Sequence, residues 1–124
     1  MMVTKFKSPI YGTNIWIVVS NSFYRAFDDI EDIIDKKIVE PEEVKSIKAY
    51  TYAYERPDGK YRMILFFKPN SDPGIIAHES KHVVNLIFSW HGVKLSITND
   101  EHECYLLGHI VNRCHNAIKK YKKK

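Results

Sequence analysis

The 124-residue sequence has little of several features that would place it in a special class of protein. Five glycines and five prolines are too few for a collagen-like or largely disordered chain. No apolar run approaches the ~20 residues that a membrane-spanning helix needs. The first twelve residues, MMVTKFKSPIYG, lack the apolar stretch and small-residue cleavage site of a secretory signal. We therefore expect one globular domain inside the cell and no membrane partner.

Cysteine is scarce, and its two occurrences, Cys104 and Cys114, fall within one predicted helix. Ten residues of helix rise by ~15 Å, whereas the Cα atoms of a disulfide lie ~5.5 Å apart. The two cysteines therefore cannot pair with each other. We expect both to be small core residues rather than ligands or nucleophiles.

Excess positive charge is absent from most of the chain, although the formal net charge is +4. The last six residues, 119–124, contain five lysines; the rest has 14 basic and 15 acidic residues, a net charge of −1. This contrast predicts a single domain over residues 1–118 and a basic tail over 119–124. A terminal lysine run is typically a solvated end, so the composition argues against a nucleic-acid partner.

Hydrophobic periodicity predicts alternating strands and helices. Ser22 and the pair Asp72–Pro73 are helix-starting residues, and Arg56–Lys60 is typical of a tight turn because it contains Pro and Gly. The predicted elements are a buried strand over 14–20, a helix over 22–38, a connector from 41, strands over 47–54 and 61–67, and helices over 72–90 and 99–120. This order predicts an α+β domain with its helices on one face of a small sheet.

One segment of the helix over 72–90 carries the pattern H-E-x-x-H, with His78, Glu79 and His82. Residues i and i+4 lie one above the other on a helix, so both histidines can direct a ring nitrogen at one ion. Glu79 lies on an adjacent face, where it can reach a metal-bound water without being a ligand. The alternative is a pair of surface histidines on an amphipathic helix.

Glu101 follows His82 after eighteen residues, and H-E-x-x-H with this spacing resembles the gluzincin metallopeptidases. The resemblance implies a Zn²⁺ site with His78, His82 and Glu101 as ligands, and Glu79 as the general base. The layout is also similar to small phage or bacterial proteins in which H-E-x-x-H precedes Asp-Glu-x-x-Ala-Tyr-Leu. This resemblance implies a minimal zincin-like core. Here the segment from Asp100 to Leu106 has Cys104 in place of that Ala, and a small residue at this position would let two helices pack closely.

The start of the last helix leaves other roles open. Thr98 and Glu101 can form a capping box, in which Glu101 only closes the helix end. Asp100 and Glu103 are alternative carboxylate ligands, and Asp100 can instead orient a ligand histidine as an outer acceptor. Tyr105 can donate its hydroxyl to a developing oxyanion, or it can be a core aromatic residue. The remaining histidines of this helix, His102, His109 and His115, are expected to be polar surface residues.

The resemblance implies a zinc metallopeptidase in the cytoplasm of a bacterial or phage-infected cell, acting on a peptide or protein. An extended substrate would pair with the strand over 61–67, as substrates do with edge strands of zincins. One alternative is a non-catalytic zinc-containing module that binds or regulates a partner. A third option is a nucleic-acid-associated protein that uses the lysine tail and exposed tyrosines of Lys48–Tyr54.

Overall fold

The computed structural model describes residues 1–38, 44, 46–98 and 100–124. The elements, in chain order, are β1 (Met2–Lys7), β2 (Asn14–Val19), α1 (Phe23–Ile34), β3 (Ala49–Glu55), β4 (Tyr61–Phe67), α2 (Pro73–Trp90) and α3 (Glu101–Lys122). The predicted connector from residue 41 lies outside the described residues as far as residue 43. Among the described helices, none is both long and apolar enough to cross a membrane.

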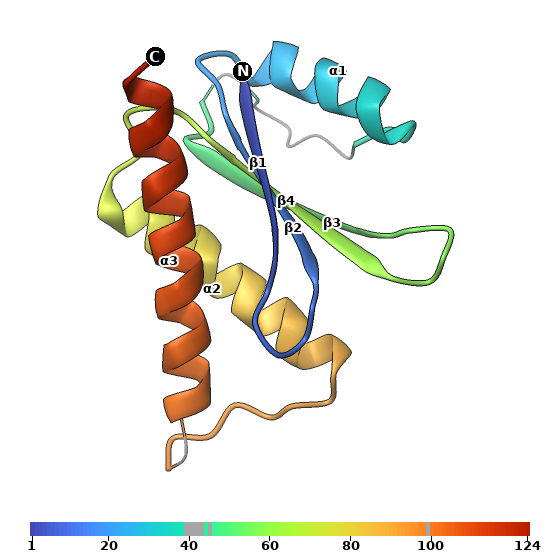
Figure 1. Cartoon of the computed structure of the whole chain (residues 1–124), viewed down its shortest axis with the longest axis vertical. Helices are drawn as coiled ribbons and strands as arrows, with labels where there is room; N and C mark the ends of the chain where they lie inside the picture. Colours follow the sequence, from blue (N-terminus) through green and yellow to red (C-terminus); the bar gives the residue numbers. More distant parts are fainter. Residues whose placement is uncertain (39–43, 45, 99) are drawn as a thin grey trace.

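The four strands form one mixed sheet in the order β1–β2–β4–β3 (Figure 1). The central strands β2 and β4 are parallel, with Asn14 opposite Arg62 and Val19 opposite Phe67. The outer strands β1 and β3 each run antiparallel to their one neighbour. Since β4 is hydrogen-bonded on both sides, the expectation that it offers an edge to a substrate is wrong. The free edges of the sheet belong to β1 and β3.

The two central strands are apolar on both faces, and each face is covered by helices. One set of side chains from β2 and β4, including Ile17 and Leu65, packs against α2 and α3. The alternate set, including Val18 and Phe66, packs against α1. The α+β class is thus confirmed, but the helices lie on both faces of the sheet rather than on one. Successive side chains of a strand point to opposite faces of the sheet, so burying both sets requires a helical layer on each face.

The first strand, β1, was not among the predicted elements. Its sequence MVTKFK has no long apolar run and no regular alternation, and Lys5 and Lys7 are exposed. A half-exposed edge strand carries a weak sequence signal because only its pairing with a neighbour stabilises it. Tertiary pairing with β2, from Met2 opposite Val19 onwards, holds this segment extended.

The helix ends largely follow the sequence signals. Asp72 caps α2, because its Oδ1 accepts a 2.8 Å hydrogen bond from the Ile75 backbone N–H. Ser22 caps α1 in the same way, but α1 ends at Ile34, four residues before the predicted end, where Asp35 adopts φ +52°. At the other terminus α3 extends through Lys122, so that most of the predicted basic tail is helical.

The two cysteines have opposite environments, which corrects the expectation that both are core residues. Cys114 is buried between α2 and α3, with its Sγ 3.9 Å from the Ser80 Oγ. Cys104 is exposed, so it does not provide the close helix contact that its position suggested. Ten residues rotate a side chain by about 280° around the helix, which places the two thiols on different faces.

This difference predicts selective thiol chemistry. Burial raises the pKa of the Cys114 thiol to about 12, with a smaller rise from Glu79, against a lowering by the hydrogen bond with Ser80. The thiol of Cys114 is therefore protonated and inert at pH 8. In the folded protein, Ellman's reagent should react with one thiol per chain, that of Cys104. After denaturant is added, it should react with a second, that of Cys114. Rapid release of two equivalents from folded protein would contradict the packing of α3.

Candidate metal centre

The helix α2 brings the ring nitrogens of His78 and His82 together. The Nε2 atoms of the two rings lie 3.2 Å apart, and the rings are nearly perpendicular, at 86°. Asp72 and Pro73 start this helix one and a half turns before His78, so that the i, i+4 pair falls on regular helix. Both side chains are exposed to solvent. The predicted convergence of the two histidines is confirmed.

This separation suits a shared metal ion. An ion ~2.0–2.1 Å from each Nε2 atom would make an N–metal–N angle of about 100°, close to that of a tetrahedral site. Two neutral imidazoles can also share one hydrogen bond at this distance, if one Nε2 is protonated. Together with Glu79, the two histidines place one ligand atom each within 4.8 Å of one another. The donor set of two imidazoles and a carboxylate is one that zinc commonly takes.

Glu79 is the buried member of this group, with 7% of its surface exposed. Its Oε1 accepts a 2.8 Å hydrogen bond from the Thr51 hydroxyl, and its Oε2 lies 3.5 Å from the His78 Nε2. Thr51 on β3 therefore fixes one carboxylate oxygen and leaves the other directed at the histidines. The sequence analysis did not single out Thr51. The available signal was a hydroxyl among alanines, since Ala49 and Ala53 are its neighbours on the same face of the strand.

A hollow of about 440 Å³ opens over this group, between α2 and the strand β3. Its lining includes the two histidines and Glu79 from α2, and Ala49 and Thr51 from β3. Because β3 pairs only with β4 among the strands that the structure describes, the hollow lies beside an edge of the sheet. A ligand in this hollow can thus contact both the proposed ion and an open strand edge.

The structure does not bring Glu101 to the two histidines. Glu101 is exposed at the first turn of α3, where it lines a separate hollow of about 460 Å³ with Ile10 and Tyr105. The acid of α3 that reaches α2 is Glu103, whose Oε1 lies 2.9 Å from the Lys81 Nζ. Two residues along a helix differ by 200°, so Glu101 and Glu103 cannot face α2 together.

The structure also defines the positions of the other residues considered at the start of α3. The N-cap of α3 is Asp100, which makes no side-chain cap hydrogen bond, so Glu101 is not at the third helical position. The alternative in which Thr98 caps this helix and Glu101 closes a capping box is therefore wrong. Thr98 instead has its Oγ1 3.2 Å from the Ser96 Oγ. Tyr105 is 77% exposed, so it is not a core residue.

Two histidines of α3 expected at the surface are partly buried. The Nε2 of His102 lies 2.7 Å from the Tyr11 hydroxyl oxygen, and the His102 ring stacks on Phe88. The Nε2 of His109 is buried without a hydrogen-bond partner. Burial, and then the charge of Arg113, lower the pKa of His109, which favours the neutral form of its ring. The loop before β2 and the strand β1, which the sequence analysis did not place, cover these rings.

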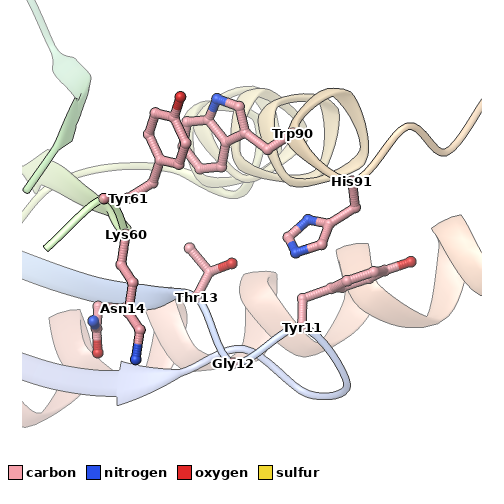
Figure 2. Close-up of a pocket in the computed structure, with 9 residues that line it drawn as sticks. Tyr11, Gly12, Thr13, Asn14, Lys60, Tyr61, Trp90 and His91 are labelled. Carbon is pink, nitrogen blue, oxygen red and sulfur yellow. The ribbon is translucent and has the colours of Figure 1, made fainter.

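A further hollow, of about 320 Å³, lies at the opposite end of α2 (Figure 2). Tyr61 stacks face to face on Trp90, with ring centroids 4.2 Å apart. Figure 2 shows His91 and Tyr11 on the other side, with Thr13 between. The described residues that line this hollow include no carboxylate or thiol, so the candidate chemistry stays with His78 and Glu79.

In comparisons with known proteins, no family model, curated protein or solved structure matches this chain. The assignment of a possible metal site therefore depends on the positions of His78, Glu79 and His82 alone.

Metal binding at this site should stabilise the fold. Zinc in hundredfold excess over its dissociation constant would add ~2.7 kcal/mol to the free energy of unfolding, a rise in Tm on the order of 10 °C. The variants His78→Ala and His82→Ala should lose this rise, as measured by thermal melting with zinc and with chelator. His115→Ala removes an exposed histidine of α3 and should keep it. Equal shifts in all four proteins would exclude the site.

The position of Glu101 yields a second test. Because Glu101 points into a separate hollow, Glu101→Ala should keep the zinc-dependent rise in Tm and change the metal-free stability by no more than ~0.5 kcal/mol. Glu103→Ala is the matched control, since it removes the other nearby carboxylate, the partner of Lys81. If Glu101→Ala alone abolished the zinc-dependent rise, Glu101 would be a third ligand and the start of α3 would have to move on binding.

Proposed function

We propose that this protein is a zinc-dependent peptidase of the zincin type. The observation that carries the proposal is the 3.2 Å approach of the His78 and His82 Nε2 atoms beside the buried carboxylate of Glu79. The histidines would hold the ion, and the acids of α3 would take no part in the resting site. When bound, Zn²⁺ lowers the pKa of its bound water and polarises the carbonyl oxygen of a substrate.

Glu79 is suited to the role of general base. Thr51 holds its Oε1, so Oε2, which faces the histidines, is the atom that would accept a proton from the attacking water. The same carboxylate can then deliver that proton to the leaving amine. Burial of Glu79 against β3 keeps the side chain in one orientation, which a proton transfer in a fixed geometry requires.

The edge of β3 defines the class of substrate that the proposal favours. An extended peptide can add to this edge through backbone hydrogen bonds, which are independent of its sequence. The hollow between β3 and α2 would then place a peptide carbonyl near the histidines. This route replaces the strand over 61–67, whose backbone groups are already paired on both sides.

A second candidate function is a metal-containing module without catalysis. It is favoured by the exposure of both histidines and by the absence of Glu101 from their group. With two imidazoles and Glu79 as the three ligands, no separate base would remain. The two functions differ in the role of Glu79, which is a base in the first and a ligand in the second.

Substitution of Glu79 by Gln distinguishes these roles. Gln keeps the acceptor for the Thr51 hydroxyl but cannot take up a proton, so zinc binding should persist while peptide hydrolysis falls by ~10²–10⁴-fold. Zinc content is measured by elemental analysis, and hydrolysis with a library of quenched fluorescent peptides. Loss of zinc in Glu79→Gln would identify Glu79 as a ligand. A zinc-loaded wild type that cleaves none of the library would overturn the peptidase proposal and leave the binding module.

A further inference from the structure

A row of cationic and aromatic side chains crosses the face of the sheet that carries α1. Lys5 on β1 and Arg62 on β4 each lie 4.2 Å from the ring centroid of Trp16 on β2. The Arg62 Nη1 donates a 2.7 Å hydrogen bond to the hydroxyl of Tyr54 on β3. The strand register accounts for the row, since Lys5 is opposite Trp16 and Tyr54 is opposite Arg62. Each strand thus contributes one member.

Lys7 extends the positive charge of this row. It is two residues from Lys5 on the same face, and it lies opposite Asn14, which is itself opposite Arg62. We call Lys5, Lys7 and Arg62 the cationic row. Both lysines are exposed. The helix α1 lies nearer the start of β1 and the end of β2 (Figure 1).

The charge of the cationic row has no counter-ion within the described part of the chain. None of its three members makes an ion pair there, and the Nε of Arg62 is buried without a hydrogen-bond partner. Asp35 and Glu55 line a separate hollow with Tyr54 and make no ion pair with the row in the described part of the chain. Two of the three cations, Lys5 and Arg62, are held over the Trp16 ring, and Lys7 adds a third charge on the same face, so the row can form a site for a polyanion.

We propose that the cationic row binds the phosphate backbone of a single-stranded nucleic acid. Neighbouring strands are ~4.8 Å apart, so cations on β1 and β4 are separated by roughly 10 Å across the sheet. A strand that crosses the sheet face can place phosphates at both, with the two lysines on one side and the positive charge of the Arg62 guanidinium on the other. This surface is distinct from the hollow that holds His78 and His82, on the far face of the sheet.

The placement of the charges favours nucleic acid over an acidic peptide. An extended peptide gains affinity by adding to a sheet edge, where backbone groups are free. The cationic row lies on the face, where the backbone of β2 and β4 is already paired. A phosphodiester backbone needs no such pairing, since its regularly spaced charges can meet the cations on the face directly.

Binding can be measured with fluorescein-labelled oligo(dT) by anisotropy at several salt concentrations. Three phosphate contacts predict a slope of about −2 for log K against log salt. The double variant Lys5→Ala/Lys7→Ala should lower the magnitude of this slope by about 1.4 and the affinity at low salt by about tenfold or more. In a Trp90→Phe background, the fluorescence of Trp16 should change on binding, because Trp16 is then the only tryptophan and lies between two of the cations.

The matched control is Lys119→Ala/Lys120→Ala, which removes the same charge from the lysine-rich end of α3. This variant should bind oligo(dT) within about twofold of the wild type, with an unchanged Trp16 response. An equal loss in both double variants would assign binding to overall charge, and a larger loss in the control would assign it to the lysine-rich end; either result would overturn the proposal. So would the absence of binding at low salt, or polyglutamate of matched charge binding as tightly as oligo(dT). Zinc-dependent melting should be normal in both variants, which separates this test from that of the metal site.

Discussion

The parallel pairing of β2 with β4 is the constraint on which the rest of this structure depends. Both strands are apolar on both faces, so water must be excluded from each face by a separate layer. The chain meets this requirement with α1 on one face and the α2–α3 pair on the other. The same pairing places β4 inside the sheet and leaves β3 at its edge. The metal-site hollow and the cationic row both follow from that order.

The candidate metal site combines a strong local signal with one tertiary contact. The histidines of α2 converge because helical spacing alone determines their separation. Their exposure follows from the burial of the opposite face of α2, where Val83 and Ile87 pack on the sheet. Thr51 adds what the helix cannot supply, a fixed orientation for the Glu79 carboxylate. A helix docked with a different rotation would keep the motif and lose this contact.

The cationic row shows how pairing redistributes charge that composition assigns elsewhere. Counted along the chain, the positive excess belongs to residues 119–124. Lys5 and Arg62 are 57 residues apart in sequence and are separated by a single ring in the sheet. Two of the tyrosines expected to be available, Tyr50 and Tyr52, are instead used to cover α1. A count of charges cannot find such a surface, because it depends on strand order and register.

The sequence by itself determined the elements with strong periodicity and clear caps: β2, β4, α2 and the pair of histidines. These depend on contacts between residues a few positions apart, so a local pattern is sufficient. Only the tertiary structure decided the strand status of β1, the split of the helices between two faces and the direction of Glu101. Spacing along the chain proposed Glu101 as a ligand. Which acid faces α2 depends instead on the rotation of α3 about its own axis. That rotation is set by the packing of Ile110 and Cys114 in the core.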